Sequence, residues 1–330
     1  MEPQEGGHVD VDRERELADV LELAMAVRQA MGQVIEGKPE VLDLVITALL
    51  AEGHLLIEDV PGVGKTMLAK SLAKAIDCSA RRVQFTPDLL PSDITGVSVY
   101  NQVTTDFEFK PGGVFANLVI GDEINRASPK TQSALLEAME ERRVSVDGTT
   151  HSLPRPFMVI ATQNPIEMEG TYPLPEAQRD RFLMRIAMGY PSAEAEVAML
   201  EHHGEVDPID PLQPVTDAAA VMRCVAIVRR VFVHPAVKDY LVAILHRTRT
   251  LADVRLGASP RAGLHLMRAA KARAAMAGRG YVIPDDITDL AGPALAHRVL
   301  LSTQAQLAGR SVTDMLTAAV REVPVPTGRR

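Results

Sequence analysis

A glycine-rich turn followed by lysine and threonine is the segment of this sequence best suited to chemistry. Residues 53–66 read GHLLIEDVPGVGKT, so an apolar run ends in a tight loop and continues into Lys65 and Thr66. In a P-loop of this form, backbone N–H groups and a helix N-terminus hold phosphate oxygens, the lysine reaches the β and γ phosphates, and the hydroxyl binds Mg²⁺. The sequence therefore predicts a nucleotide-phosphate site with Lys65 on phosphate and Thr66 on the metal.

The loop departs from the full P-loop consensus at one position. The pattern GxxxxGK[ST] has glycine where this chain has Asp59. The half that touches phosphate is intact, because Gly62 and Gly64 supply backbone conformations that a side chain disfavours. We expect the nucleotide to contact Asp59, Val60, Pro61, Gly62, Val63, Gly64, Lys65, Thr66 and Met67.

Two adjacent carboxylates stand at the end of a second apolar run. Asp122 and Glu123 follow the segment 118–120, at the carboxyl end of a predicted strand, where open parallel sheets place their ligands. Asp122 is expected to hold hydrated Mg²⁺. Glu123 points elsewhere, because side chains alternate along a strand, and is expected to act as general base on the attacking water. The alternative interpretation of Asp122 and Glu123 is a solvated acidic turn after the strand, and the presence of a P-loop earlier in the chain argues against it.

Four other polar residues are candidates for contact with the reacting phosphates. Asn164 follows the apolar run 157–161 and either orients the attacking water or forms a turn before proline. Arg179 and Arg181 are of a type that usually lies on the surface, yet phosphoryl transfer needs a cation on the developing charge. Arg261 begins a predicted helix, where its charge opposes the helix dipole unless an anion lies nearby.

The elements that must position these residues alternate between strands and helices over residues 13–190. Short apolar runs predict strands, and apolar residues at helical spacing predict helices. We expect strands at 54–57, 82–85, 118–120, 157–161 and 184–188, helices at 13–31, 41–50, 67–76 and 129–140, and hairpins at 97–109 and 143–153. Asp147 and Gly148 form a typical turn for the second hairpin. This alternation is typical of an α/β domain.

The composition changes after residue 190, and residues 191–330 are expected to form a second, all-α domain. Prolines and glycines separate its candidate helices, as expected at helix boundaries. These helices are 193–202, 217–231, 235–250, 260–277 and 284–300. Residues 1–12 are polar and are expected to be a disordered tail, and the proline-bearing end of the chain is expected to be loose.

The bulk composition is that of an ordinary globular protein, with 46% hydrophobic and 24% charged residues. The net charge of −8 argues against bulk capture of nucleic acid or an anionic membrane, although a local basic patch at Lys110, Arg142 and Arg143 stays open. The two cysteines fit no metal spacing and are expected to be core thiols in a reducing compartment. We see no spanning segment and no signal peptide, and expect a cytoplasmic protein.

Several longer stretches together carry a family likeness. They are DVPGVGKT (59–66), QFTPDLLPSDITG (84–96), DEINRA (122–127), ATQNPIEMEGTYPLPEAQ (161–178), DRF (180–182) and SPRA (259–262). On these motifs the sequence resembles the MoxR family of AAA+ ATPases over about residues 20–300. The resemblance implies a P-loop AAA+ αβα sandwich with a five-stranded parallel sheet, followed by a smaller α-helical lid, with ATP between them. It also implies that 86–113 is the helix-two insert and 143–153 the hairpin before the first sensor.

The resemblance also implies roles for single residues. Asn164 then looks like the first sensor, Arg261 like the second sensor from the lid, and Arg181 like the finger that reaches a neighbouring subunit's ATP. Relatives more often carry an apolar residue in place of Arg179, so either arginine is a candidate finger and we favour Arg181. Gly121 stands where alanine is usual, which is expected to be harmless. Similar proteins form hexameric rings, usually work with a von Willebrand-A-type partner, and act as chaperone-like assembly or metal-insertion motors.

The favoured interpretation is a ring motor that hydrolyses ATP with Mg²⁺ to remodel or mature a partner protein. A metal-chelatase motor subunit is the nearest alternative, because its helix-two-insert architecture is similar. A DNA-translocating motor belongs to a different class, which the acidic balance opposes. A nucleotide-gated scaffold without hydrolysis is a third class, which the intact set of Glu123, Asn164 and arginines opposes.

Overall fold

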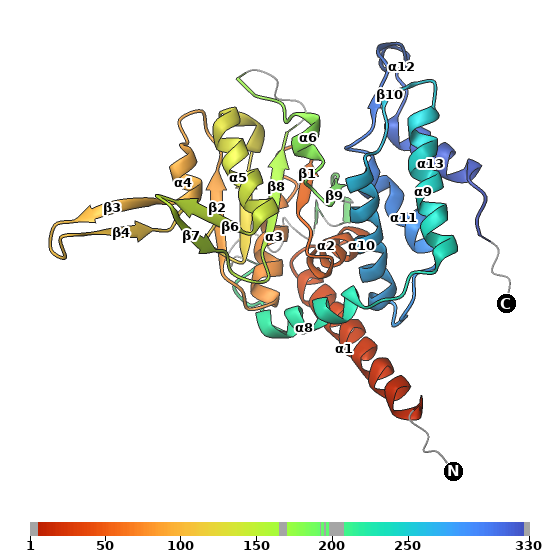
Figure 1. The fold of residues 1–330 in the computed structure, drawn as a ribbon, viewed down its shortest axis with the longest axis horizontal. Helices are drawn as coiled ribbons and strands as arrows, with labels where there is room; N and C mark the ends of the chain where they lie inside the picture. Colours follow the sequence, from red (N-terminus) through yellow and green to blue (C-terminus); the bar gives the residue numbers. More distant parts are fainter. Residues whose placement is uncertain (1–5, 165–169, 192, 195, 198–207, 327–330) are drawn as a thin grey trace.

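The structure, a computed structural model, describes residues 6–164, 170–191, 193–194, 196–197 and 208–326. Its centre is a five-stranded sheet in the order β2-β5-β8-β1-β9, in which every neighbouring pair is parallel (Figure 1). The strands are β1 (Leu55–Glu58), β2 (Ala80–Gln84), β5 (Leu118–Asp122), β8 (Met158–Gln163) and β9 (Met184–Ile186). The predicted α/β fold with a five-stranded parallel sheet is confirmed.

Alternate residues of the central strand β1 enter two separate cores. The helices that cover the sheet are α1 (Gly6–Gly32), α2 (Pro39–Leu50), α3 (Lys65–Ala75) and α5 (Pro129–Glu141). Leu55 and Ile57 pack with α1, α2 and α3, whereas Leu56 packs with α5. All three side chains are fully buried. A strand that is covered on both faces needs apolar residues at every position, which is why 55–57 is a continuous apolar run and not an alternating one. Both faces of the sheet are therefore covered, and the carboxyl ends of its strands remain accessible for a site.

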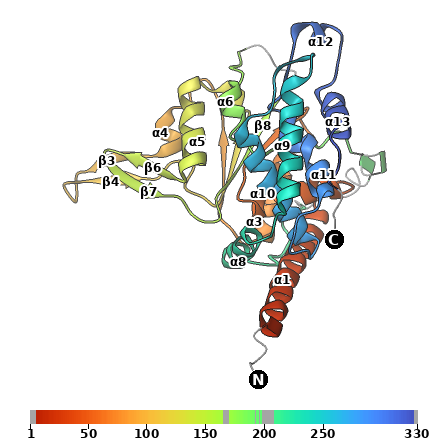
Figure 2. The same ribbon diagram turned by 45° about the vertical axis from the view of Figure 1, so that its right-hand side comes forward.

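Two β-hairpins project from the sheet domain on the side away from the lid (Figures 1 and 2). One consists of β3 (Val97–Asn101) and β4 (Asp106–Lys110), and the other of β6 (Arg143–Val146) and β7 (Thr149–Ser152). The short helix α4 (Pro91–Thr95) precedes the first hairpin. Both hairpins are antiparallel, as predicted from the sequence. The rings of Phe109 and His151 stack with centroids 3.8 Å apart and join the two hairpins. The outer part of the β3–β4 hairpin is exposed, with 92% of Val103 and 68% of Phe107 accessible.

The chain beyond β9 forms a mainly helical lid beside the sheet domain (Figure 1). Its helices are α8 (Ala218–Arg229), α9 (Pro235–Thr250), α10 (Pro260–Met276), α11 (Pro284–Leu295), α12 (Thr303–Leu307) and α13 (Val312–Glu322). The expectation of an all-α domain is wrong in one respect, because β10 (Val254–Leu256) and β11 (Leu300–Leu301) form a small antiparallel sheet. These strands are too short for a period to be recognised in the sequence. We had not predicted α12 and α13, and most of the predicted helix 193–202 lies outside the described residues.

Helix α1 packs against both the sheet domain and the lid. It begins at Gly6, so residues 6–12, which we expected to be disordered, continue the helix, and residues 1–5 lie outside the described part. The helix is already formed from Leu17 onward, where its buried face packs on the core. Extending a formed helix toward its N-terminus costs little free energy, because each added residue gains a hydrogen bond. α1 contacts α2 and α3 and also α8 and α10, so the lid shares one continuous core with the sheet domain. Among the described helices, none has the length and apolar character needed to span a membrane.

Candidate functional site

The loop between β1 and α3 has the backbone geometry of a phosphate cradle. Gly62 and Gly64 have φ angles of 84° and 88°, in the left-handed region that glycine adopts at little cost. Leu68 N donates to Gly64 O at 3.0 Å and so begins the hydrogen bonding of α3. A helix offers no intrahelical acceptor to the N–H groups of its first turn, so these groups point toward the loop. The loop therefore suits an anion at the positive end of the helix dipole.

Asp59, the departure from the P-loop consensus, holds the loop to a neighbouring segment. Its Oδ1 accepts from Val60 N at 2.8 Å, and its Oδ2 accepts from the N–H groups of Met188 and Gly189 at 2.6 Å each. Its carbonyl oxygen accepts from Lys65 Nζ at 2.6 Å. The carboxylate therefore ties the loop to the chain after β9, which a glycine side chain would not do.

Asp122 lies at the carboxyl end of β5, beside the start of α3. It is 5% exposed, and its Oδ2 accepts from Thr66 Oγ1 at 3.4 Å. Thr162 Oγ1 donates to its Oδ1 at 3.3 Å, and Arg82 Nε donates to its Oδ2 at 2.6 Å. A carboxylate next to a hydroxyl is a ligand pair that Mg²⁺ uses beside phosphate oxygens. The structure thus brings the two expected metal ligands, Thr66 and Asp122, together.

Glu123 makes a different set of contacts from its neighbour Asp122. Its φ of 57° is in the left-handed region, which is uncommon for residues other than glycine. Its N–H donates to Thr162 Oγ1 at 3.0 Å, which fixes the backbone in this conformation. Its Oε2 accepts from Gln84 Nε2 at 2.8 Å and from Arg126 Nη1, in η1 (Ile124–Arg126), at 3.1 Å. Two donors on different elements therefore set the orientation of this carboxylate.

These side chains surround a cavity of about 270 Å³ at the carboxyl edge of the sheet. It is lined by Pro61, Gly62, Gly64, Lys65, Thr66, Met67, Arg82, Gln84, Asp122, Glu123, Thr162 and Asn164. Asn164, which follows β8, is only 8% exposed. These side chains come together because the strands are parallel, so their carboxyl ends lie at the same edge of the sheet. Gln84, for example, lies opposite Asp122. Asp59, Val60 and Val63 belong to the loop but do not line this cavity.

Sequence reasoning missed Arg82, Gln84 and Thr162 in this cavity. Arg82 and Gln84 are two residues apart in β2, so both side chains lie on one face of the strand. β2 is too polar and exposed for its buried face to be assigned from an apolar pattern. The polar residues at alternate positions, Arg82 and Gln84, are the feature of the sequence that could have indicated a polar face directed at the site. Thr162 is two residues before Asn164 and offered the same signal in β8.

Arg181 and Arg261 lie at the opposite edge of the sheet. Arg181 Nε donates to Glu140 Oε2 at 3.0 Å, and Arg261 Nη2 donates to Glu140 Oε1 at 2.5 Å. Both arginines line a second cavity, of about 650 Å³, together with Glu52 and His54 from the chain just before β1. The P-loop follows β1, so the two cavities lie at opposite ends of that strand and share no lining residue.

This placement separates Arg261 from the P-loop of its own chain, whereas ATP held between the sheet domain and the lid, as expected from the resemblance, would bring the two together. The part of α10 that carries Arg261 faces the amino edge of the sheet, because α10 packs against α1 and α2. α2 ends at Leu50, directly before β1 begins. The residues described around the P-loop cavity all come from the sheet domain. Arg261 is therefore brought to Arg181 and not to the P-loop of its own chain.

The second cavity is rich in positive charge. Glu52 accepts from Arg229 Nε at 2.8 Å and also from Arg142, and Arg268 Nη2 donates to its carbonyl oxygen at 2.9 Å. Burial alone would raise the pKa of Glu52, but the hydrogen bonds and charges of Arg142 and Arg229 outweigh it and lower that pKa. Burial lowers the pKa of Arg268, and the nearby charge of Arg142 adds to the effect. The arginines outnumber the two carboxylates of the lining, so the cavity favours an added anion.

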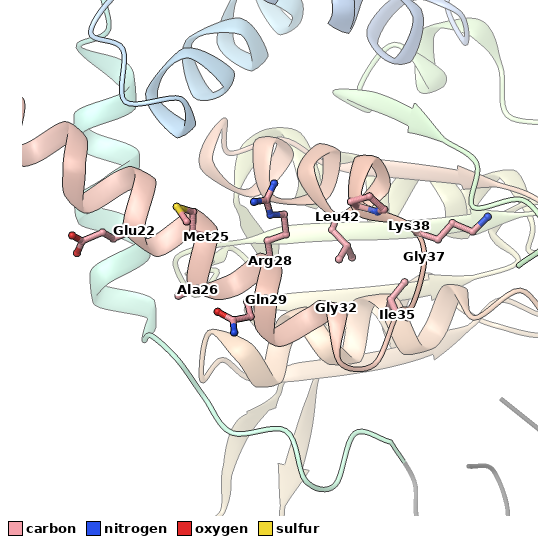
Figure 3. A pocket seen from close by; sticks show the side chains of 11 residues that line it. Glu22, Met25, Ala26, Arg28, Gln29, Gly32, Ile35, Gly37, Lys38 and Leu42 are labelled. Atoms are coloured by element: carbon pink, nitrogen blue, oxygen red, sulfur yellow. The ribbon is translucent and has the colours of Figure 1, made fainter. Parts of the chain in front are cut away.

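A third hollow, of about 530 Å³, lies between α1 and α2 (Figure 3). The residues labelled there come from α1, α2 and the turn between them. Lys38 at one end donates to Tyr190 O at 2.8 Å, and Met25 on α1 is 53% exposed. This hollow shares no lining residue with the other two cavities. Within the described ranges, no group of three or more acidic, histidine or cysteine side chains is placed to hold a metal ion.

Two family models match the chain. The model of the ATPase family associated with various cellular activities (AAA) matches residues 54–184, and that of the AAA lid domain matches residues 246–319. The first match runs from the start of β1 to the start of β9, and so contains the P-loop and both carboxylates. The second runs from the end of α9 into α13.

Relatives with known names cover nearly the whole chain. The "Uncharacterized protein YeaC" of Bacillus subtilis is 50% identical over 299 residues, which are 91% of this chain and 93% of that protein. The "Chaperone MoxR1" of Mycobacterium tuberculosis is 41% identical over 318 residues, which are 94% of this chain and 84% of that protein. A crystal structure from Cytophaga hutchinsonii matches with a TM-score of 0.90 at 35% identity, covering 97% of this chain and 100% of that one.

Proposed function

The chain belongs to the MoxR family of AAA+ ATPases, and on that premise we propose that it is an ATP-hydrolysing ring motor that remodels or matures a partner protein. The observation that carries this proposal is the meeting of Lys65, Thr66, Asp122 and Glu123 at one cavity. A phosphate cradle, a pair of metal ligands and a carboxylate base are the parts that phosphoryl transfer to water requires.

Lys65 and the loop N–H groups are proposed to hold the β and γ phosphates, and Thr66 and Asp122 to hold Mg²⁺. The fit is supported by the space beside Gly62, where an added Cβ would meet no atom within 4 Å. It is also supported by the contact between Thr66 Oγ1 and Asp122 Oδ2 at 3.4 Å. Bound Mg²⁺ supplies positive charge that neutralises the phosphates during transfer.

Glu123 is the proposed general base, and Asn164 the residue that orients the attacking water. Both side chains line the P-loop cavity from neighbouring strand ends. A base acts only within hydrogen-bond reach of the proton that it removes, so its orientation matters as much as its pKa. Gln84 and Arg126 donate to the Glu123 carboxylate, and these hydrogen bonds are proposed to restrain its movement toward the attacking water and so to lower the basal rate of hydrolysis.

Arg181 and Arg261 are proposed to complete the site of the next subunit in a ring, which the family resemblance makes a hexamer. The two arginines lie on the far edge of the sheet from their own P-loop and share the carboxylate of Glu140. A cation that stabilises the developing charge in phosphoryl transfer is commonly supplied by a second protein molecule. Arg179 is the weaker candidate, since it does not line this cavity and its buried Nε has no hydrogen-bond partner among the described residues.

The β3–β4 hairpin is the proposed contact with the client protein. It projects from the sheet domain, and its exposed apolar residues include Val103 and Phe107. Exposed apolar surface of this kind is typical of protein interaction sites. The name of the Mycobacterium tuberculosis relative supports a chaperone role, and we propose that a von Willebrand-A-type protein acts as its partner.

ATP hydrolysis per protomer, measured against protein concentration with and without Mg²⁺, tests the proposed function. We expect the specific rate to rise with concentration, because neighbouring subunits complete each site, and to vanish when Mg²⁺ is chelated. A flat but appreciable rate would show that each subunit is self-sufficient and would reject the ring mechanism. Intact ATP binding without hydrolysis at any concentration would identify a nucleotide-gated scaffold instead.

A further inference from the structure

The segment that carries Arg181 is a turn without regular secondary structure. It lies between α6 (Glu176–Arg179) and β9. Its N–H groups are bonded, because Arg181 N donates to Gln178 O at 3.2 Å, Phe182 N to Arg179 O at 3.1 Å and Leu183 N to His54 O at 2.8 Å. Phe182 and Leu183 are fully buried and hold it on the side of the sheet domain. A residue that contributes to catalysis must be held within about 0.5 Å of its productive place. The carbonyl groups of Asp180, Phe182 and Leu183 are a second means of fixing this turn, because they accept from the lid.

Arg298 of the lid supplies contacts on both sides of Arg181. Its Nη2 donates to the carbonyl oxygens of Asp180, at 3.0 Å, and of Phe182, and its Nη1 donates to Leu183 O at 3.1 Å. Its Nε donates to Asp180 Oδ1 at 2.7 Å, and only 2% of its side chain is exposed. One guanidinium thus binds the residue before the arginine and the two residues after it.

Helix α10 of the lid holds the same aspartate. Ser259, the N-cap of α10, donates from Oγ to the Asp180 carboxylate oxygens at 3.1 and 2.9 Å. His265 Nδ1, six residues further along the chain in α10, accepts from Arg298 Nη2 at 2.6 Å. Burial, with the charge of Arg298 as the next cause, lowers the pKa of His265 to about 3, so the ring stays neutral and can accept. Arg261 lies in the first turn of this helix, so one helix start fixes both Asp180 and Arg261.

The residues of this network, Asp180, Ser259, His265 and Arg298, cannot move independently of one another. A buried guanidinium is tolerated only when its charge is paired and its N–H groups are bonded. For Arg298, the pair is Asp180, and three of its six described acceptors are backbone carbonyl groups of residues 180–183, the others being Asp180 Oδ1, Ala294 O and His265 Nδ1. A rotation of the lid that carries Arg298 away must therefore either carry the turn along or break the ion pair.

We propose that Arg298 is a positioning residue for Arg181, and that the Asp180–Arg298 pair transmits the orientation of the lid to the arginine that enters the neighbouring subunit's site. The inference rests on the proposed function, because it takes Arg181 to act on the next subunit's nucleotide. Arg298 lines neither the P-loop cavity nor the cavity of Arg181. Its loss should therefore spare ATP binding in its own subunit and lower turnover in the neighbour.

The variant Arg298→Lys separates charge from positioning. Lysine keeps the positive charge but cannot bridge a carboxylate and several carbonyl groups at once. We expect ring assembly and the dissociation constant for a non-hydrolysable ATP analogue to stay within about twofold of the wild type. We expect kcat to fall roughly 100-fold, the effect of a misplacement near 1 Å. A kcat within about twofold of the wild type in assembled rings would overturn the proposal.

A matched control comes from another arginine–aspartate pair of the lid. Arg279 donates to Asp286 with Nη1 at 2.9 Å and Nη2 at 2.6 Å, and Asp286 is buried. Arg279→Lys disturbs this pair without touching residues 180–183. We expect it to lower the melting temperature as Arg298→Lys does, while kcat stays within about twofold of the wild type. An equal loss of kcat in the control would show that general lid damage, and not positioning of Arg181, explains the result.

Mixed rings distinguish failure of this inference from failure of the proposed function. Subunits with Arg298→Lys keep the base, and subunits with Glu123→Gln keep a well-placed Arg181, so mixing the two should restore hydrolysis above either alone. A mixture of Arg181→Ala and Glu123→Gln subunits is measured in parallel. If hydrolysis recovers in the mixture of Arg181→Ala and Glu123→Gln but not in the mixture of Arg298→Lys and Glu123→Gln, the role proposed for Arg298 is overturned. Recovery in neither mixture, in rings shown to contain both subunits, would overturn the action of Arg181 between subunits.

A second variant keeps the test valid if Arg298→Lys does not fold. The double variant Asp180→Asn/Arg298→Gln removes both charges, so neither is left buried alone. Circular dichroism and the melting temperature establish that it is folded, and the same kinetic and mixing measurements follow. The expected result is again a large loss of kcat with recovery in mixed rings. Unchanged kcat in the folded double variant would overturn the proposal.

Discussion

Arg82 Nε lies 2.6 Å from Asp122 Oδ2, the same oxygen that accepts from the Thr66 hydroxyl. The guanidinium therefore sits on the carboxylate that we propose for Mg²⁺. The side chain of Arg82 is 55% exposed and that of Asp122 only 8%, so the arginine is able to swing away while the carboxylate stays. Two cations on one oxygen repel each other, so arrival of the metal should weaken this ion pair.

Arg82→Ala is expected to lower the melting temperature of the nucleotide-free protein and to enlarge the rise produced by Mg²⁺ with a non-hydrolysable ATP analogue. The reason is that Asp122 then lacks a counter-charge until the metal binds. Thermal unfolding with and without the ligand measures both effects. Arg81→Ala is the control, since Arg81 donates to Gly112 O at 2.9 Å and does not line the cavity. A rise equal to or smaller than that of the wild type would show that Arg82 and the metal do not compete.

Glu123→Gln should retain ATP binding and lose turnover. The amide keeps the shape of the carboxylate but does not accept a proton from water, and general bases contribute about 10² to 10⁴ in rate. Binding of a fluorescent ATP analogue and steady-state hydrolysis are the two measurements. Turnover within about tenfold of the wild type would remove Glu123 from the role of base.

Gln84→Ala is expected to raise the basal hydrolysis rate roughly fivefold to tenfold. Gln84 Nε2 donates to Glu123 Oε2 at 2.8 Å, and a hydrogen bond to a charged group contributes about 1.5 to 3 kcal/mol, part of which opposes movement of the base toward water. The double variant Gln84→Ala/Glu123→Gln serves as control and should stay inactive. An unchanged or lower rate in the single variant would mean that Gln84 supports the active orientation of the base.

The P-loop and the acidic pair were predictable because the residues that define each motif are adjacent in the chain. Asp122 ends a strand that is buried throughout, Glu123 follows it directly, and Lys65 and Thr66 begin a helix, so local patterns place them. Gln84 was not predictable in this way. Its partner Glu123 directly follows another strand, β5, and only the parallel register of β2 and β5 brings the two side chains together.

The position of the lid was the part of the site that local patterns did not encode. Ser259 and Pro260 correctly predicted where α10 begins, because capping is a local property. Which edge of the sheet that helix start approaches depends on the packing of α10 against α1 and α2. The sequence predicted a phosphate contact for Arg261 without indicating which subunit holds the phosphate, and the structure places Arg261 beside Arg181 and Glu140.

His54 makes the stability of the protein depend on pH. Its Nδ1 accepts from Val159 N at 2.9 Å, and its Nε2 donates to Met139 O at 3.0 Å. Burial lowers the pKa of His54 to about 3, whereas the unfolded chain titrates near 6.5. Between pH 6.5 and pH 3, His54 is therefore protonated in the unfolded chain and neutral in the folded protein. Stability should therefore fall with decreasing pH in this window, by about 1.4 kcal/mol per pH unit from this residue.

His54→Gln tests this contribution, because an amide can accept from Val159 N and donate to Met139 O without titrating. Chemical unfolding at pH 7 and pH 5 gives the free energy of unfolding of both proteins. The difference between the two pH values should be smaller in the variant than in the wild type by about 2 kcal/mol, allowing for partial titration near the upper pKa. Equal differences in both proteins would show that His54 is protonated in the folded state or that the unfolded state does not titrate normally.

Glu140 binds the two arginines that we propose for the neighbouring subunit's phosphates. Its Oε2 accepts from Arg181 at 3.0 Å and its Oε1 from Arg261 at 2.5 Å, so one carboxylate occupies both guanidinium groups. If the phosphates of the next subunit bind these arginines, the contacts with Glu140 must weaken during assembly. The carboxylate should therefore hold the arginines in place in the isolated subunit and oppose their transfer to the ring.

Glu140→Gln is expected to lower the protein concentration at which the specific hydrolysis rate is half-maximal. The side chains involved are 30% to 41% exposed, so solvent screening limits the gain to roughly twofold to fivefold. Glu141→Gln is the matched control, because Glu141 pairs with Arg143 at 2.9 Å and contacts neither arginine. Hydrolysis measured over a dilution series gives both values. A higher half-maximal concentration in Glu140→Gln would mean that the carboxylate orients the arginines for the neighbouring site and does not mask them.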